Sequence, residues 1–312
     1  MGRKTPRDHS EPFCRLVRFE ATDGVELPGL LYEPKRPAGR AVVYLHGTGG
    51  SSVFDSKRTN LVAEELVARG FAYLPFNNRG AHLVRRLRAR SRGSSRSFDG
   101  GSAHEVIRDC VRDIDGVARF LRQRGYRELF LVGHSTGAIK IDDYDHRKPR
   151  NPFRKYVLLA GGDDTGGLYA RLGPRRFRAV LGRSRAMIAA RRGDEIAPAT
   201  VATPMMSWRS LRDMINPDGD YNVFPFLEAL RGLKLSRKAR FRYVRAIRKP
   251  ALFVYGDQDE YCFGDVAACV RILANAIGPK PSAELVVMEG ANHGFSGRER
   301  ELGALIAKWL AG

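Results

Sequence analysis

The sequence predicts an α/β fold, with a mostly parallel, twisted sheet, helices on both faces and an inserted helical cap. Short runs of wholly apolar residues recur along the 312 residues, as at 129–132 (LFLV) and 251–255 (ALFVY), and such runs are typical of strands buried on both faces. Between them lie longer segments whose apolar residues recur every three or four positions, which is the pattern of amphipathic helices. Strands that alternate with helices form a parallel sheet through right-handed crossovers.

The elements of the first half follow from these patterns and from the turn residues between them. Thr22-Asp23-Gly24 separates two strand-like segments, so we expect an N-terminal hairpin. Residues 81–103 are basic and rich in Gly and Ser, and we expect a long loop there. The other elements expected before residue 163 are strands at 13–20, 25–32, 40–45, 71–75, 129–132 and 155–160, and helices at 57–69, 104–124 and 136–144.

Residues 163–248 interrupt this alternation of strands and helices. The segment is Arg-rich and helical in pattern, and four prolines divide it. We expect a cap inserted between two strands over the C-terminal edge of the sheet, so that residues 1–162 and 249–312 form the core. The aromatic residues expected to give the cap its apolar mass are Trp208, Tyr221, Phe224, Phe226 and Tyr243. The elements expected after the cap are strands at 251–255 and 284–288 and helices at 263–276 and 298–310.

The composition limits the classes of partner. The net charge of +20 would suit a polyanion, an anionic membrane surface or an acidic substrate, although a solvated Arg-rich surface is the interpretation that we favour. The sequence has no zinc-finger spacing and no aromatic-basic RNA-binding motif, so no specific nucleic-acid partner is expected. No run of about 18 apolar residues exists, so no membrane span is expected.

The termini and cysteines indicate a cytoplasmic protein. The N-terminal segment is basic but has no apolar stretch, so we expect no secretory signal. The four cysteines show no metal or disulfide spacing, which indicates reduced thiols.

A candidate nucleophile follows the buried strand at 129–132. Residues 133–137 (GHSTG) fit G-x-S-x-G, in which a sharp turn from strand to helix lifts the central serine clear of the sheet. The flanking glycines avoid a clash at this turn. We therefore expect Ser135 to be the nucleophile. A serine hydroxyl is weak until a neighbouring base takes its proton.

His293 is the expected base, because it follows the last predicted strand at the edge where α/β sheets bind their ligands. His134 is expected to point elsewhere, and His46 to brace the glycine-rich loop that contains it. The carboxylate partner is Asp259 or Asp257, which both follow the strand at 251–255. We prefer Asp259, because it lies further into the loop and can reach across to a histidine on the next strand's loop.

The loop at 46–50 (HGTGG) follows the strand at 40–45. Glycines let backbone N–H groups approach a ligand closely, and a loop of this kind beside the nucleophile supplies an oxyanion donor. We expect the oxyanion hole to be formed by the backbone N–H groups of Thr48 and Thr136.

These motifs carry a resemblance to a known family. The segments HGTGG (46–50), NNRG (77–80), GHSTG (133–137), YGDQDE (255–260) and NHGF (292–295) are similar, in order, to motifs of the α/β-hydrolase superfamily. The chain resembles its serine hydrolases over residues 13–160 and 249–312. The resemblance implies the α/β-hydrolase fold, and an acid three residues after Gly256, which is Asp259. Residues 160–166 and 216–226 also resemble a branch related to fungal siderophore esterases.

The expected function is a cofactor-free hydrolase that cleaves carboxylic esters through an acyl-enzyme on Ser135. Its substrate would be a small acyl compound, and the positive charge would allow an anionic one. The same triad would also serve an amide or thioester hydrolase or an acyltransferase. A third hypothesis, from another class, is a non-catalytic binding protein that uses its basic surface.

Other polar clusters give weaker signals. No G-x-G-x-x-G motif or P-loop is present, so no nucleotide cofactor is expected. Asp142, Asp143 and Asp145 form an acidic cluster of the kind that binds a divalent metal, but basic residues lie beside them, and we expect surface ion pairs and no metal. Asp163 and Asp164 follow a strand at the catalytic edge, where they either contact the substrate or cap the next helix.

Overall fold

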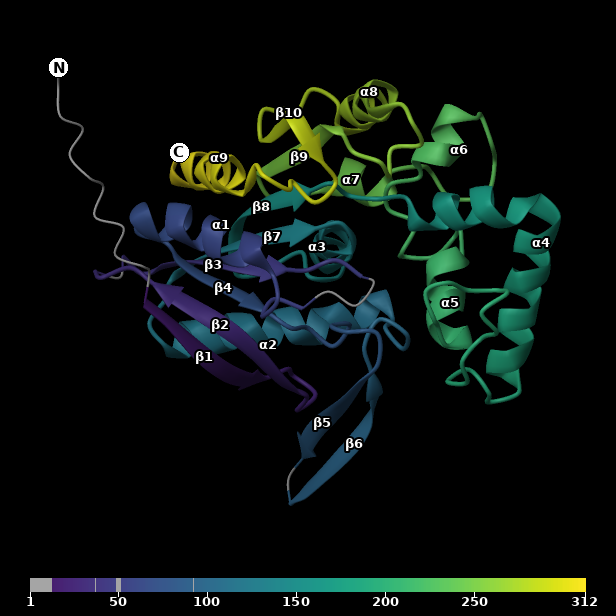
Figure 1. The fold of residues 1–312 in the computed structure, drawn as a ribbon, viewed down its shortest axis with the longest axis horizontal. Coiled ribbons are helices and arrows are strands. Elements are labelled where there is room, and N and C mark those ends of the chain that lie inside the picture. Colours follow the sequence, from purple (N-terminus) through teal and green to yellow (C-terminus); the bar gives the residue numbers. More distant parts are fainter. Residues whose placement is uncertain (1–12, 37, 49–51, 92) are drawn as a thin grey trace.

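The computed structural model describes residues 13–36, 38–48, 52–91 and 93–312. Within these ranges one large sheet forms from eight strands. The strands are β1 (Phe13–Glu20), β2 (Glu26–Glu33), β3 (Arg40–Leu45), β4 (Ala72–Phe76), β7 (Glu128–His134), β8 (Phe153–Leu159), β9 (Ala251–Gln258) and β10 (Ala283–Asn292). Their order is β1-β2-β4-β3-β7-β8-β9-β10, and all neighbours from β4 to β10 are parallel (Figure 1). The expected N-terminal hairpin and mostly parallel sheet are confirmed.

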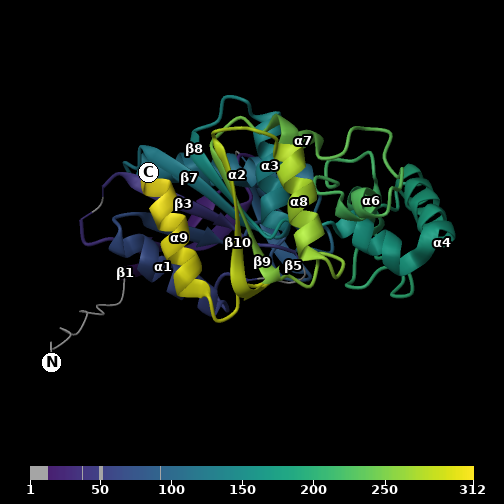
Figure 2. The same cartoon turned by 90° about the horizontal axis from the view of Figure 1, so that it is seen from above.

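Helices cover both faces of the sheet, as expected (Figure 2). They are α1 (Lys57–Ala68) and α9 (Glu299–Ala311) on one face, and α2 (Cys110–Gln123), α3 (Thr136–Arg147) and α8 (Val266–Ile277) on the other. Successive residues of the central strands alternate between the two layers: Val42 packs with α1 and α9, and Val43 packs with the opposite layer. Each such fully buried side chain contributes about 1.5–3 kcal/mol, which explains why these strands are apolar throughout.

The expectation of a loop at 81–103 is wrong. This region contains an antiparallel hairpin, β5 (Arg85–Ser91) and β6 (Ser94–Gly100), which projects from the sheet (Figure 1). In β5 the arginines alternate with Leu87 and Ala89, whose side chains are buried. Ala89 also forms a bridge to Val25 beside β2. The alternation has the period of a strand, and the density of arginine hid it.

The segment between β8 and β9 contains α4 (Asp164–Ala189), α5 (Trp208–Ile215), α6 (Phe226–Leu230) and α7 (Arg242–Ala246). Figure 1 shows α4, α5 and α6 beyond the C-terminal ends of β7 and β8. α4 bends where Gly173 adopts φ 72° before Pro174. None of the helices in the described ranges combines the length and apolar character that crossing a membrane needs.

The inserted segment divides between two apolar clusters. Side chains of α4 and α5, among them Phe177, Trp208 and Leu211, form a cluster separate from the sheet. The other four aromatic residues expected in the cap pack instead in the core beneath the sheet; these are Tyr221, Phe224, Phe226 and Tyr243. The second part of the segment therefore returns to the main core.

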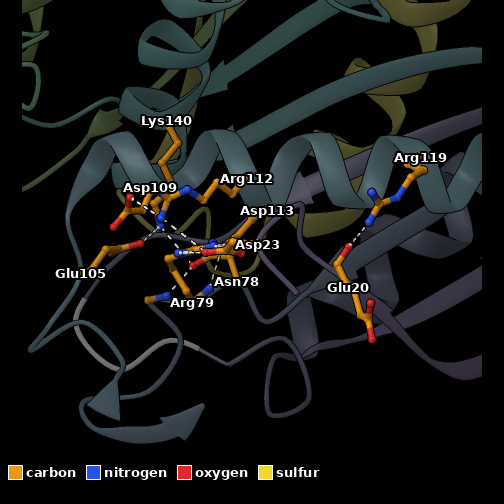
Figure 3. A network of polar contacts seen from close by, with 11 residues as sticks. Glu20, Asp23, Asn78, Arg79, Glu105, Asp109, Arg112, Asp113, Arg119 and Lys140 are labelled. Atoms are coloured by element: carbon orange, nitrogen blue, oxygen red, sulfur yellow. Dashed lines mark hydrogen bonds and ion pairs between the residues drawn. The ribbon is translucent and has the colours of Figure 1, made fainter. Parts of the chain in front are cut away.

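A buried polar network lies beside α3 (Figure 3). The Arg79 guanidinium contacts Asp113 of α2 at 2.7 Å and Asp23 of the N-terminal hairpin at 3.1 Å. Lys140 of α3 contacts Glu105 at 2.6 Å and Asn78 Oδ1 at 3.3 Å. These contacts tie the 77–80 loop to both helices and fix the position of α3 behind the sheet edge.

Candidate active site

Ser135 occupies the turn from β7 into α3. Its φ of 57° and ψ of −121° are strained for a residue with a side chain. The flanking glycines are required, because a Cβ at Gly133 would lie 2.2 Å from the Gly137 carbonyl oxygen, and one at Gly137 would lie 2.2 Å from the Leu45 carbonyl oxygen. Ser135 remains partly exposed although its neighbours are buried. The structure thus places Ser135 in the conformation that the G-x-S-x-G pattern predicts.

His293 and Asp259 lie together at the same edge of the sheet. The His293 Nδ1 is 3.0 Å from Asp259 Oδ1 and 3.1 Å from Oδ2. Asp259 follows β9 and His293 follows β10. Because these strands are parallel neighbours, their C-terminal ends place the two side chains next to each other. The Asp259 carboxylate is buried and also accepts a hydrogen bond from the Tyr261 N–H at 2.9 Å. Asp257, the alternative acid, is exposed.

Three further residues hold the backbone of His293 and Gly294. His134 Nε2 donates to the His293 carbonyl oxygen at 2.8 Å, and the two rings lie 5.0 Å apart. Burial lowers the pKa of His134 well below its usual range, so its ring stays neutral. Glu260 Oε2 accepts from the His293 N–H at 3.0 Å, and Arg58 donates to the Gly294 carbonyl oxygen at 2.8 Å. His134 thus points toward the His293 loop, which the sequence did not reveal.

The loop after β3 passes against Ser135. A Cβ at Gly47 would lie 3.0 Å from Ser135 Cβ and 3.5 Å from its Oγ. His46 Nδ1 donates to the Gly47 carbonyl oxygen at 2.6 Å, in agreement with a bracing role. Burial, with the nearby Lys140 charge, lowers the pKa of His46 to about 3. Gly49 and Gly50 lie outside the described residues, and the oxyanion roles of Thr48 and Thr136 stay predictions.

The link between nucleophile and base is also a prediction. Within the described ranges, no hydrogen bond joins Ser135 Oγ to His293. Hydrogen bonds of this kind are often long before substrate binds and shorten in the complex.

The two acidic residues after β8 have different environments. Asp163 caps α4: its carboxylate accepts from the N–H groups of Gly166 at 2.7 Å and Leu227 at 2.8 Å. Burial raises the pKa of Asp163 to about 7. Asp164 Oδ2 instead lies 3.5 Å from Oγ1 of Thr136, the residue after Ser135. Of the two roles that the sequence left open, Asp163 therefore has the capping role, and a substrate contact by Asp164 stays a prediction.

The acidic cluster on α3 is buried, so the expectation of surface ion pairs is wrong. Asp143 does contact Arg147 at 2.9 Å, and Asp145 contacts Arg248 at 3.5 Å, but both carboxylates are buried. Asp145 accepts from the Tyr156 hydroxyl at 2.9 Å, and both carboxylate oxygens of Asp142 are buried without a hydrogen bond. The expectation failed because neighbouring elements enclose α3 on all sides. In the part of the chain that the structure describes, no group of three acidic, cysteine or histidine side chains fits a metal.

A profile of the Alpha/beta hydrolase family matches residues 42–305. Among solved structures, the chain is similar to Est1E from Butyrivibrio proteoclasticus with ferulic acid bound, at 16% identity and a TM-score of 0.59 over 95% of this chain and 98% of that one. It is also similar to the Pyrococcus furiosus esterase Pf2001, at 17% identity and a TM-score of 0.56 over 99% and 96%. Identities this low support the shared fold alone. No curated protein matches the sequence. Because the profile spans most of the chain, the protein belongs to the Alpha/beta hydrolase family.

Proposed function

We propose that the chain is a serine hydrolase that cleaves carboxylic esters through a Ser135, His293 and Asp259 triad and an acyl-enzyme intermediate. The observation that carries the proposal is the backbone of Ser135, held at φ 57° and ψ −121° on the sheet edge where His293 meets Asp259. A conformation of this kind costs about 1–3 kcal/mol and persists where strain serves a site. The proposed substrate is a small acyl compound.

In the proposed reaction, Ser135 Oγ attacks the ester carbonyl carbon while His293 Nε2 takes its proton. Asp259 accepts the Nδ1–H, fixes the tautomer of the ring and stabilises the imidazolium. The N–H groups of Thr48 and Thr136 donate to the oxyanion, and one such donor is worth about 2.7–4 kcal/mol. The alcohol leaves with the proton from His293, and a water molecule then attacks the acyl-enzyme by the same steps.

The surroundings of His293 support its role as a base. Glu260 and His134 bind its backbone N–H and carbonyl, and Arg58 binds the next carbonyl. A base whose own backbone is held at two points, and the next residue at a third, is restricted in how its ring can turn, and catalysis by proximity requires such a fixed orientation.

Labelling with a fluorophosphonate tests the proposal. We expect the wild-type protein to be modified at Ser135 and to hydrolyse p-nitrophenyl butanoate. Ser135→Ala should lose labelling and about 10⁴-fold or more in kcat, whereas Ser296→Ala, which alters an exposed serine, should retain both. Equal turnover by wild type and Ser135→Ala would refute the proposal.

The same residues would also serve an amide hydrolase, a thioester hydrolase or an acyltransferase. A panel of ester, anilide and thioester with a common acyl group, with and without an added alcohol acceptor, separates these reactions. We expect the highest kcat/KM for the ester. A faster thioester or a dominant transfer product would reassign the chemistry without changing the triad.

A further inference from the structure

A second carboxylate lies beside the proposed nucleophile. Asp164 Oδ2 is 3.5 Å from Thr136 Oγ1. The Tyr221 hydroxyl is 3.4 Å from the same Thr136 oxygen, and its proximity lowers the pKa of Asp164. Thr136 directly follows Ser135 and is a proposed oxyanion donor, so the Asp164 carboxylate contacts the side chain of a residue of the proposed site. Asp164 is partly exposed, whereas Asp163 is buried.

This carboxylate has no basic partner in a very basic protein. The chain contains 54 Lys and Arg residues, yet in the described part of it no Lys or Arg acts on Asp164. The groups that act on it are Tyr221, His293 and Thr136. By contrast, Asp143 and Asp113 each contact an arginine. Among the described residues, the favourable charges that act on the Asp164 carboxylate are therefore limited to the His293 ring and the N-terminal end of α4.

A carboxylate in this position has a chemical consequence. When a substrate carbonyl becomes an oxyanion, a nearby carboxylate repels the developing charge and raises the barrier. A cation on the substrate would cancel this repulsion and pair with the carboxylate. Burial raises the pKa of Asp164, so an ionised carboxylate gains most when a cation binds beside it.

We propose that Asp164 binds a cationic ammonium group of the substrate, carried within a few bonds of the scissile carbonyl carbon. Tyr221 and Thr136 hold the carboxylate in place for this contact. The inference rests on the proposed ester hydrolysis and specifies its substrate class. It is opposite in sign to the anionic substrate that the net charge alone would allow.

Substrate pairs that differ only in charge test the inference. On the acyl side, p-nitrophenyl 4-(trimethylammonio)butanoate is compared with p-nitrophenyl 5,5-dimethylhexanoate. On the leaving-group side, acetylthiocholine is compared with S-(3,3-dimethylbutyl) thioacetate. Each pair exchanges a quaternary nitrogen for carbon, so shape is constant. In at least one pair the wild-type protein should favour the cationic member by about tenfold or more in kcat/KM.

Variants assign the preference to Asp164. Asp164→Asn, which keeps the size of the side chain, should bring the ratio of cationic to neutral substrate close to one. Asp164→Glu keeps the charge and should retain a preference. The control is Asp194→Asn, which removes a carboxylate from the exposed surface of the same inserted segment and should leave the ratio unchanged.

Other outcomes overturn the inference. A wild-type ratio near or below one in both pairs would do so, as would a preference that Asp164→Asn leaves intact. If Asp164→Asn slowed both members of a pair equally, Asp164 would act only through the His293 imidazolium and bind no substrate cation.

Inactivation rates separate this inference from the proposed function. Two methylphosphonothioates are used, one with a thiocholine leaving group and one with its 3,3-dimethylbutyl isostere. Failure of both to modify Ser135 would end the proposed function. Modification at equal rates would end only the assignment of Asp164, even if the protein hydrolysed none of the four esters.

Discussion

Lys140 Nζ lies 2.6 Å from Glu105 Oε1, and the Lys140 side chain has no exposed surface. Lys140 is five residues after Ser135 on α3, so this ion pair connects the nucleophile's helix to the segment before α2 (Figure 3). The same ammonium contacts Asn78 Oδ1 at 3.3 Å. A buried charge needs such partners, because removing one leaves the other desolvated and unpaired.

Lys140→Met should therefore destabilise the fold by about 3–5 kcal/mol, measured as the free energy of unfolding in urea. The matched control is Lys148→Met, just past the C-terminal end of α3, whose pair with Asp115 is partly exposed and should contribute less than about 1 kcal/mol. Lys140→Met combined with Glu105→Leu should recover part of the loss. Equal losses for Lys140→Met and Lys148→Met would contradict this prediction.

Asp259 and Asp257, which lie at the C-terminal end of β9, should differ sharply in their effect on catalysis. Asp259→Asn removes the carboxylate that accepts the His293 Nδ1–H. This change should lower kcat for p-nitrophenyl butanoate by about 10⁴-fold, because the ring is no longer held in the tautomer whose Nε2 can accept a proton. Asp257→Asn, at an exposed position, should change kcat by less than about twofold. The reverse result would transfer the role of the acid to Asp257.

The buried His46 should make stability depend on pH. Its pKa is about 3 in the folded protein because burial disfavours the imidazolium, whereas in the unfolded chain the pKa is about 6.5. The stability that this difference contributes is fully present above pH 6.5 and is lost as the pH falls toward 3. Relative to His46→Asn, the wild-type protein should lose about 1.4 kcal/mol of unfolding free energy per pH unit between pH 6 and 4. A difference that is constant with pH would exclude this effect.

Two glycine substitutions should have opposite effects on thermal stability. Gly137→Ala would place a Cβ 2.2 Å from the Leu45 carbonyl oxygen, so it should cost about 1–3 kcal/mol or more and disrupt the nucleophile turn. Gly182→Ala, in α4, meets no atom within 4 Å and should stabilise the protein by about 0.5–1 kcal/mol. Calorimetry of both variants checks the contrast, and a stable, active Gly137→Ala protein would refute the proposed turn geometry.

The features that were predicted correctly are those that a short segment of the sequence determines. The turn around Ser135 depends on two glycines within five residues, and the parallel strands depend on short apolar runs. The β5–β6 hairpin was missed because β5 has only two buried side chains, Leu87 and Ala89, and arginines fill most of its other positions. Local patterns were sufficient to predict a feature wherever the residues that determine it lie close together in the sequence.

The missed parts of the site depend on contacts between distant segments. Tyr221 meets Thr136 across 85 positions, and His134 reaches His293 across 159. Neither contact follows from a motif, because packing of the inserted segment and of the last strand decides it. Glu260 lies next to Asp259, yet its bond to the His293 backbone emerges only when β9 and β10 are aligned.

The inserted segment leaves the sheet after β8 and returns at β9, two strands that are direct neighbours. Its α4–α5 part has an apolar cluster of its own, while residues from Tyr221 onward belong to the main core. The α4–α5 part is also joined to the segment before α2, where Asp213 accepts from the Ile107 N–H at 2.7 Å. A longer or shorter connection between α4 and α5 would therefore leave both this contact and the β8–β9 ladder unbroken.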